Sequence, residues 1–236
     1  MEIELKLDPI ILCGGLGTRI QSKSKGLPKS LMPVGDKVFL DYVFESLNKY
    51  QIKKTILSLH YRPDEFLSYI DQNHFSFEII PVVEPSAMDT GGAIKYIFDN
   101  TPISDPFFVL NGDTLSNTNL DLMKAAFEMS DYDAIIGISY VNNASRYGKV
   151  KFNGDCLIEF SEKTSSSSGW INNGHYIFKK KAFNGLSGKF SLERDIFPKL
   201  VKKNKLGVFQ VVNDSFIDMG LPEDYEKLCK LFEASK

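Results

Sequence analysis

The residues whose types and spacing could do chemistry begin with a glycine-rich segment near the N-terminus. It reads "GGLGTR" (14–19) and directly follows an apolar run at 9–13. Glycines let backbone N–H groups converge on a phosphate chain, because no Cβ stands in the way, and arginine supplies a permanent positive charge. Residues 19–29 also contain three lysines and no acidic residue. The segment therefore predicts a local binding site for a polyanion.

Two familiar phosphate-binding patterns do not fit this segment. The dinucleotide pattern GxGxxG would need a glycine at position 20, which is Ile20, and the pattern GxxxxGK[ST] has no match in the chain. The remaining interpretation is a loop that holds a triphosphate as a substrate rather than a dinucleotide as a cofactor.

Two carboxylates stand at the ends of predicted strands. Asp113 follows the apolar run "FFVLNG" and Asp218 follows "SFI". Carboxylates delivered in this way can bind Mg²⁺, which prefers one or two carboxylates together with phosphate oxygens and water. An aspartate at a strand end also commonly caps a turn or a helix. Taken one at a time, the two aspartates leave both interpretations open.

Cysteine and histidine offer little chemistry by their spacing. Cys13, Cys156 and Cys229 are far apart and form no CxxC or Cys/His pattern, so we expect neither a disulfide framework nor a zinc site. Cys13 ends an apolar run, where a small buried residue is expected rather than a nucleophile. Among the three histidines, His175 is the one candidate for a site wall, with a packed strand residue as the alternative.

The composition restricts the classes of function. The chain has 236 residues, of which 43% are hydrophobic and 25% charged, as is typical of a globular domain with a real core. A formal net charge of −2 argues against a nucleic-acid partner or an anionic membrane partner. The N-terminus is acidic and no apolar run reaches about 18 residues, so we expect a cytoplasmic protein without a membrane span.

The elements that must position these residues follow a regular rhythm. Short β-type runs alternate with helical patterns at 9–15, 39–51, 54–61, 63–73, 77–84, 91–100, 106–113 and 120–130. From about residue 134 strand-like runs dominate, before two closing helices. We therefore predict one α/β domain over 1–236, with a Rossmann-like, open, mostly parallel sheet, added strands in the second half, and the ligand at the carboxyl ends of the strands.

Six motifs, in order, resemble those of the sugar-1-phosphate nucleotidyltransferase family, and the first of them consists of two segments. The family pattern (L)xGGxGTRL, followed by PKxxxPVxxxP(F/L), is matched by "LCGGLGTR" and "PKSLMPVGDKVFL", with Ile20 and Val38 as conservative departures. The other matching segments are "EPSAMDTGGAIK" (84–95), "VLNGDT" (109–114), "EFSEK" (159–163), "NNGHYIF" (172–178) and "FIDMGLPEDY" (216–225). Within the family, the chain most resembles the single-domain guanylyltransferases that act on D-glycero-D-manno-heptose 1-phosphate.

The resemblance implies a fold, a reaction and a cofactor. The fold is the GT-A-like nucleotidyltransferase fold, with a nucleotide-binding part at about 1–133 and a sugar-phosphate-binding part at about 134–236. In the family reaction, an oxygen of a sugar 1-phosphate attacks the α-phosphorus of a nucleoside triphosphate and pyrophosphate leaves. The resemblance implies Mg²⁺ held by Asp113 and Asp218, with catalytic roles for Arg19, Lys29 and Asp113.

By the same resemblance, two sets of residues are expected to contact the substrates. The nucleotide contacts are Leu12, Cys13, Gly14, Gly15, Gly17, Thr18, Arg19, Lys29, Glu84, Thr90, Gly91 and Asp113. The sugar-phosphate contacts are Asn111, Gly148, Glu162, Lys163 and Asn173. The "TSSSSG" tract at 164–169 is interpreted either as a lid over the sugar or as a surface hairpin.

Glu84 carries the prediction of the base. Guanine offers adjacent N1–H and N2–H donors that one carboxylate accepts together, whereas uracil and thymine offer one donor flanked by acceptors. We therefore predict transfer of GMP from GTP. The resemblance implies heptose 1-phosphate as the acceptor, for a bacterial surface glycan such as capsule or lipopolysaccharide. The alternatives are a cytidylyl-, uridylyl- or thymidylyltransferase, and a non-catalytic subunit that senses nucleotide sugars. The sequence leaves the oligomeric state open, a homo-oligomer included.

Overall fold

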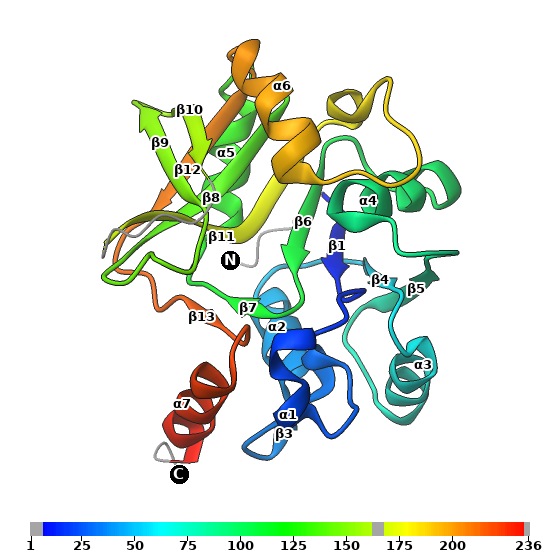
Figure 1. The fold of residues 1–236 in the computed structure, drawn as a ribbon. Helices are drawn as coiled ribbons and strands as arrows, with labels where there is room; N and C mark the ends of the chain where they lie inside the picture. Colours follow the sequence, from blue (N-terminus) through cyan, green and yellow to red (C-terminus); the bar gives the residue numbers. More distant parts are fainter. Residues whose placement is uncertain (1–6, 162–167, 234–236) are drawn as a thin grey trace. The chain divides into compact units, whose positions relative to one another are not determined.

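The computed structural model describes residues 7–161 and 168–233 (Figure 1). The chain divides into two compact units, and each is described by itself. The first unit comprises residues 1–87, 111–115 and 217–236, and the second comprises residues 88–110 and 116–216. Both units combine strands with helices, which agrees with the predicted α/β class. Within the described ranges, no helix is long and apolar enough to cross a membrane.

The first unit is built on three parallel strands. β1 (Pro9–Leu12), β4 (Lys54–Leu59) and β5 (Glu78–Val83) pair in the order β5-β4-β1. Leu12 lies opposite Ser58, and Ser58 lies opposite Val82, so the three strands end at the same edge. The glycine-rich segment follows β1 and Glu84 follows β5, which places both at the carboxyl edge where open α/β sheets bind ligands.

Helices and short elements complete the first unit. In α2 (Phe39–Asn48), five apolar residues spaced along one helix face are buried, as an amphipathic helix requires. α3 (Pro63–Gln72) begins with proline, whose missing N–H costs nothing in the first turn. The other elements are η1 (Thr18–Ile20), α1 (Gln21–Ser24), η2 (Lys29–Leu31), β2 (Pro33–Val34), β3 (Lys37–Val38), β7 (Thr114–Leu115), β13 (Ile217–Asp218) and α7 (Pro222–Glu233).

The second unit contains a mixed sheet. Its strands are β6 (Phe107–Asn111), β8 (Ala134–Val141), β9 (Lys149–Asn153), β10 (Cys156–Ser161), β11 (Gly169–Phe178) and β12 (Leu206–Val211), in the order β6-β11-β8-β12-β10-β9. β11 runs antiparallel to both β6 and β8, whereas β12 is parallel to β8. The strand-rich second half of the chain thus supplies the added strands that the sequence predicts.

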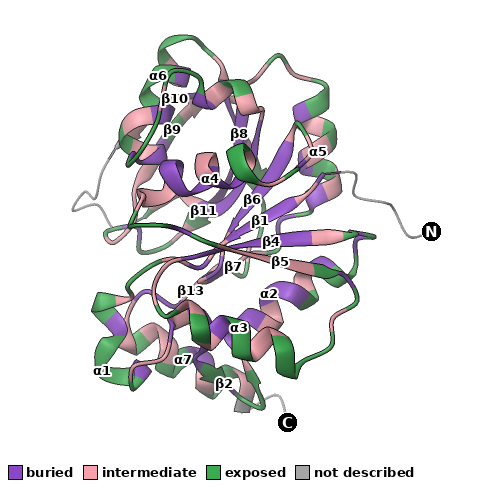
Figure 2. Ribbon diagram, turned by 90° about the vertical axis from the view of Figure 1, so that its right-hand side faces the viewer, coloured by how far each residue is buried: buried purple, intermediate pink, exposed green. Residues whose placement is uncertain are grey.

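The helices of the second unit are α4 (Asp89–Asn100), α5 (Leu120–Glu128), η3 (Lys180–Phe183), η4 (Leu192–Ile196) and α6 (Phe197–Lys202). Figure 2 shows that its central strands are buried, whereas α5 turns exposed positions outward. Asn119 caps the start of α5, and its side chain accepts hydrogen bonds from two backbone N–H groups at 3.1 Å. Phenylalanine rings fill the core beneath α4, with Phe178 and Phe183 centroids 5.3 Å apart.

The boundaries between the two units do not fall at residue 133, where the nucleotide-binding part is predicted to end. Residues 88–110 group with the second unit, and residues 217–236 return to the first. α7 belongs to the first unit because its residues pack there, for example through Tyr42 and Phe232, whose ring centroids are 4.4 Å apart. Such packing between residues far apart in the chain produces no local pattern of apolar residues in the sequence. A single functional domain over 1–236 stays a prediction.

Candidate active site

The glycine-rich loop follows β1 in the first unit, and its three glycines differ in their surroundings. A Cβ added at Gly15 would meet nothing within 4 Å, so this position is open to a ligand. Gly17 has φ of 57°, in the left-handed region that favours glycine. Thr18 and Arg19 follow in η1 and are exposed, whereas Ile20 is buried and anchors the turn. The loop therefore presents backbone and a guanidinium to solvent, as the sequence predicts for an anion site.

Gly14 has a role that the phosphate interpretation does not include. A Cβ at Gly14 would lie 2.7 Å from Oε1 of Glu84, so the glycine makes room for a carboxylate. The same Oε1 accepts a hydrogen bond from the Ser58 hydroxyl at 3.0 Å. Both side chains are buried, with exposed fractions of 8% for Glu84 and 1% for Ser58.

The end of β1 is held by backbone hydrogen bonds. Leu12 accepts one from Gly112 at 3.0 Å, and Cys13 donates one to Ser58 at 2.9 Å. Burial raises the pKa of the Cys13 thiol to about 12, which agrees with the expectation of a packed residue rather than a nucleophile. All three cysteines are free. The strand end is therefore a rigid platform for the loop that follows it.

Lys29 lies between the two predicted metal ligands. Its Nζ is 2.7 Å from Oδ2 of Asp113 and 3.6 Å from Oδ1 of Asp218. The three side chains are partly buried, with exposed fractions of 11%, 37% and 18% respectively. Lys29 begins η2, and the two aspartates are brought together because β7 and β13 pair, with Asp218 opposite Thr114. The first unit thus gathers residues that are far apart in the sequence.

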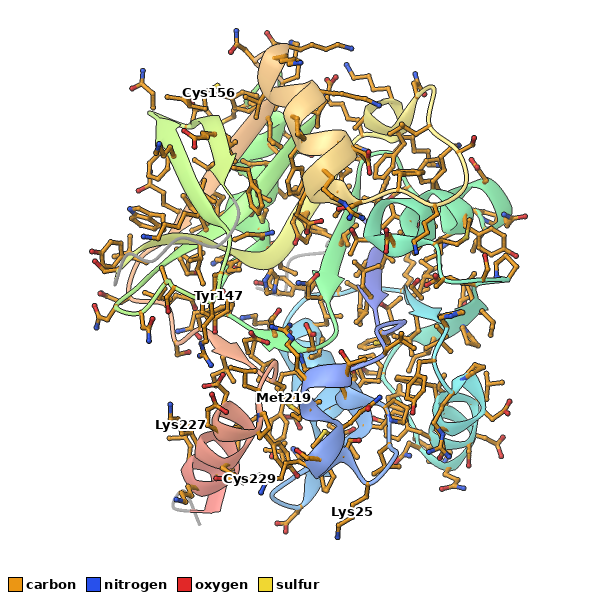
Figure 3. All side chains as sticks on the ribbon, viewed as in Figure 1. Lys25, Tyr147, Cys156, Met219, Lys227 and Cys229 are labelled. Atoms are coloured by element: carbon orange, nitrogen blue, oxygen red, sulfur yellow. The ribbon has the colours of Figure 1, made fainter. Side chains whose placement is uncertain are left out.

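The environment of Asp218 disfavours its charged form. Burial raises the pKa of this carboxyl, and the ammonium of Lys29 only partly offsets that effect, while Asp113 adds to it. Gly220 makes room for the carboxylate, because a Cβ there would lie 2.8 Å from Oδ2. Met219, labelled in Figure 3, is fully buried and donates its N–H to the Asp113 carbonyl at 3.0 Å. The two aspartates are therefore held by a rigid backbone.

The donor set of this cluster suits a hard divalent cation. Two carboxylates already hold one cationic group, the Lys29 ammonium, at hydrogen-bonding and ion-pair distances. Within the ranges that the structure describes, no group of three or more His, Cys, Asp or Glu side chains could hold a metal by itself. This composition fits Mg²⁺, which commonly uses one or two carboxylates and takes its other ligands from substrate phosphates and water.

The other lysines of the 19–29 segment lie at the surface. Lys23 forms an ion pair with Glu226 of α7 at 2.6 Å, and both side chains are largely exposed. Lys25, labelled in Figure 3, is exposed and has φ of 49°. These positions support the expectation that Lys29, rather than Lys23 or Lys25, is the lysine of the site.

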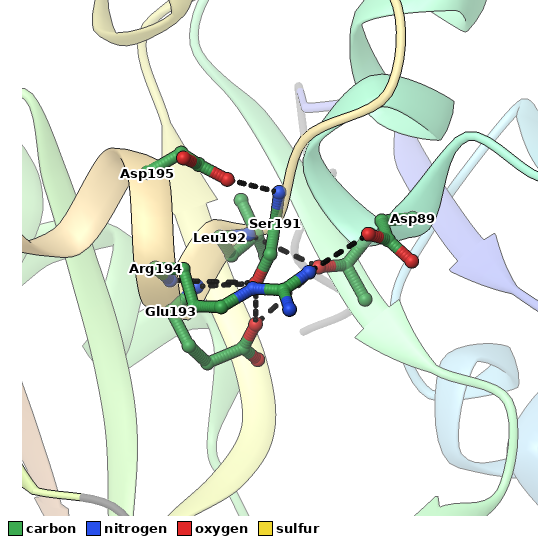
Figure 4. A network of polar contacts seen from close by, with 7 residues as sticks. Asp89, Ser191, Leu192, Glu193, Arg194 and Asp195 are labelled. Carbon is green, nitrogen blue, oxygen red and sulfur yellow. Dashed lines mark hydrogen bonds and ion pairs between the residues drawn. The ribbon is translucent and has the colours of Figure 1, made fainter.

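In the second unit, Thr90 and Gly91 lie in the first turn of α4 and are bound to a distant segment. Figure 4 shows Arg194 of that segment pointing toward Asp89 at the start of α4. The N–H of Gly91 donates to the Phe190 carbonyl at 3.0 Å, and Thr90 Oγ1 accepts from the N–H of Leu192 at 3.1 Å. Arg194 binds the Asp89 carboxylate at 2.9 Å. The Gly91 N–H, which could have faced a phosphate, thus already has a partner, and the nucleotide contacts of Thr90 and Gly91 stay a prediction.

The residues predicted to contact the sugar phosphate differ in their burial. Asn173 is fully buried, and its Nδ2 lies 3.0 to 3.1 Å from the hydroxyls of Ser116, Thr118 and Ser139. This burial favours a positioning role over direct contact with a sugar hydroxyl. His175 is 5% exposed, as expected for a packed strand residue.

Of the four other residues with a predicted sugar-phosphate contact, the structure describes two. Asn111 ends β6 and Gly148 precedes β9, and both are partly exposed. Glu162 and Lys163 lie outside the described residues, as does most of the 164–169 tract. The contacts predicted for these residues therefore stay predictions.

A comparison with known protein families shows which family the chain belongs to. The nucleotidyl transferase family pattern matches residues 8–235. The chain belongs to the nucleotidyl transferase family. Two similar relatives are D-glycero-alpha-D-manno-heptose 1-phosphate guanylyltransferases, each 36% identical to this chain. The protein from Campylobacter jejuni aligns over 222 residues, covering 93% of this chain and 97% of the relative. The protein from Aneurinibacillus thermoaerophilus aligns over 227 residues, covering 95% and 97%.

Solved structures share this fold. HddC from Yersinia pseudotuberculosis, crystallised with GMP-PN, has a TM-score of 0.81 and 34% identity, covering 96% of this chain and 99% of that chain. The inositol-1-phosphate CTP transferase from T. maritima has a TM-score of 0.77 at 20% identity, covering 98% of each chain, and shows the fold alone. The family and fold class predicted from the sequence are thereby confirmed.

Two residues of this nucleotidyl transferase family member were missed by sequence reasoning. Ser58 contacts Glu84, but it sits inside an apolar strand run and carries no local signal of a site. Gly220 follows Asp218 by two positions, within a segment that was used only for its aspartate. Gly220 could have been found from the sequence, because it lies in a segment that matches the family. Ser58 could be placed beside Glu84 only from the pairing of β1, β4 and β5.

Proposed function

We propose that this protein transfers GMP from GTP to D-glycero-D-manno-heptose 1-phosphate and releases pyrophosphate. The observation that carries the proposal is the contact of Lys29 with Asp113 and Asp218 in the unit that also bears the open glycine loop. The names of the two 36% identical relatives support guanylyl transfer and this sugar phosphate. The crystallisation of HddC with GMP-PN supports a guanine nucleotide.

The reaction needs charge neutralisation more than a general base. The second pKa of a phosphate monoester is about 6, so the sugar phosphate is largely dianionic at neutral pH and can attack without losing a proton to a side chain. Two anionic groups must then approach each other, and positioning with fixed positive charge lowers that barrier. We assign Arg19 to the leaving pyrophosphate and Lys29 to the α-phosphate, with the open backbone at Gly15 beside the phosphate chain.

Asp113 and Asp218 would hold Mg²⁺ in this proposal. When bound there, Mg²⁺ would supply positive charge that offsets part of the negative charge of the phosphates. For that binding, the Lys29 ammonium would exchange its contact with the carboxylates for one with the phosphates. Charge balance favours this exchange, because the triphosphate offers the ammonium more negative charge than two aspartates do.

Glu84 is proposed to recognise guanine through N1–H and N2–H. Its carboxylate lies against Gly14 at the edge where β1, β4 and β5 end. We propose that the sugar phosphate is bound by residues at Asn111, Gly148, Glu162, Lys163 and Asn173, with Asn173 acting by positioning its neighbours. We further propose a cytoplasmic role in making a precursor for capsule or lipopolysaccharide, by a monomer or a homo-oligomer.

A substrate panel tests the proposal. The purified protein with Mg²⁺ is incubated with each of GTP, ATP, CTP, UTP and dTTP and with several sugar 1-phosphates, and pyrophosphate release is recorded. We expect the fastest release with GTP and the heptose 1-phosphate. Turnover with CTP, UTP or dTTP but not with GTP would contradict the assignment of guanine as the base. The proposal of nucleotidyl transfer would still stand. No release with any pair would overturn the proposal.

A further inference from the structure

Ser58 and Glu84 make a buried contact at the carboxyl ends of β4 and β5. The Ser58 hydroxyl donates to Oε1 of Glu84 at 3.0 Å, and Gly14 leaves the space that this carboxylate occupies. We infer that Ser58 and Gly14 fix the Glu84 carboxylate as the acceptor for the guanine edge, and so determine discrimination against purines without an N2 amino group. The inference rests on the proposed function, in which Glu84 accepts guanine.

Both ends of the contact are attached to rigid backbone. Ser58 accepts the Cys13 N–H at 2.9 Å, and the N–H of Glu84 donates to Leu59 at 2.7 Å. Ser58 also lies in the ladder between Leu12 and Val82. A side chain held by strands is positioned more accurately than one held by a loop. Ser58 can therefore transmit the geometry of the strand edge to the Glu84 carboxylate.

The chemistry of the carboxylate makes such positioning effective. Each carboxylate oxygen can accept two hydrogen bonds, so Oε1 can serve Ser58 and a base at the same time. Acceptance of N1–H and N2–H together requires the carboxylate plane to match the base edge, which the serine bond and the missing Cβ at Gly14 restrict. A purely structural bond would satisfy a buried charge but would leave base discrimination unchanged.

The test compares GTP with ITP, whose base keeps N1–H and lacks the N2 amino group. With the heptose 1-phosphate saturating, wild-type kcat/KM for GTP should exceed that for ITP by about 10- to 100-fold, the value of one hydrogen bond to a charged group. Ser58→Ala should lower this ratio about threefold or more, through a higher KM for GTP with kcat nearly unchanged. Gly14→Ala, which pushes against Oε1, should also lower the ratio.

A matched control separates positioning from stability. Thr55→Val on the same strand removes another buried hydroxyl bond, from Thr55 Oγ1 to the Pro9 carbonyl at 3.1 Å, and should keep the wild-type ratio. If Ser58→Ala does not fold, Gly14→Ala decides the question by itself. The inference would be overturned if folded Ser58→Ala protein kept the wild-type ratio of kcat/KM for GTP to that for ITP. If Ser58→Ala does not fold, the same result for Gly14→Ala would overturn it. So would wild-type enzyme that uses GTP and ITP equally, although nucleotidyl transfer itself would stand.

Discussion

At the residue scale, the cluster of Lys29, Asp113 and Asp218 joins function to a cost in stability. Asp218 is a partly buried carboxyl whose pKa is raised by desolvation, even with an ammonium 3.6 Å away. A group with these surroundings is retained in the charged form only at the expense of folding free energy. The arrangement is understandable if the negative charge is needed to bind a cation together with the substrate.

Asp218→Asn should raise the free energy of unfolding at pH 7 in metal-free buffer. The folded pKa of Asp218 lies above its unfolded value near 3.8, so the folded state binds the proton more tightly and wild-type stability falls as pH rises between the two values. The gain from Asn should therefore shrink as pH falls toward 3.8 and be complete above the folded pKa. Urea unfolding at several pH values measures it.

The same variant should lose activity. Asp218→Asn should release pyrophosphate at least about 100-fold more slowly, because the metal supplies several kcal/mol of charge stabilisation. A variant that is stabilised but fully active would remove Asp218 from the metal site. A destabilised variant at pH 7 would contradict the argument from its pKa.

Lys29→Met should lower kcat about 100- to 1,000-fold, as expected for loss of one group that stabilises transition-state charge. Lys23→Met is the matched control, because Lys23 belongs to the same segment but pairs with Glu226 at the surface. Exposed ion pairs contribute little, so the control should keep its kcat and nearly all of its stability. Steady-state kinetics with GTP measures both variants, and equal losses would contradict the assignment of Lys29.

At the element scale, the sequence predicted the alternation of strands and helices because apolar runs and turn residues are local signals. It placed the glycine loop after β1 and the aspartates at strand ends for the same reason. It did not predict the pairing of β7 with β13, two-residue strands that are about 100 positions apart in the chain. It also assigned the segment at Thr90 and Gly91 to the nucleotide alone, because the bonds of α4 to residues 190–194 are long-range.

Gly92→Ala should test the packing role of the start of α4. A Cβ at Gly92 would lie 2.3 Å from the Gly188 carbonyl oxygen, a backbone atom that cannot move away easily. Overpacking of this kind costs about 1 to 3 kcal/mol. Urea denaturation should show that loss in the free energy of unfolding. An unchanged stability would indicate that residues 188–190 yield readily, and would contradict a rigid connection.

At the scale of the whole molecule, the chain returns to its first unit twice after leaving it. Residues 111–115 and 217–236 bring Asp113 and Asp218 to the unit that holds Arg19 and Lys29. The predicted boundary at residue 133 could not anticipate this, because it followed the change in strand rhythm. Local sequence signals placed both aspartates at strand ends and left their role open. Family resemblance, which spans the chain, assigned both to one metal site, and that assignment stays a prediction.

The central claim is tested most directly by the fate of the α-phosphorus of GTP. In one measurement, the protein, Mg²⁺, heptose 1-phosphate and GTP labelled with ³²P at the α position are mixed, and the products are separated. Label should enter a nucleotide sugar in step with pyrophosphate release, and EDTA should abolish this transfer. Label found in GDP with release of inorganic phosphate, or label that stays in GTP, would contradict the account.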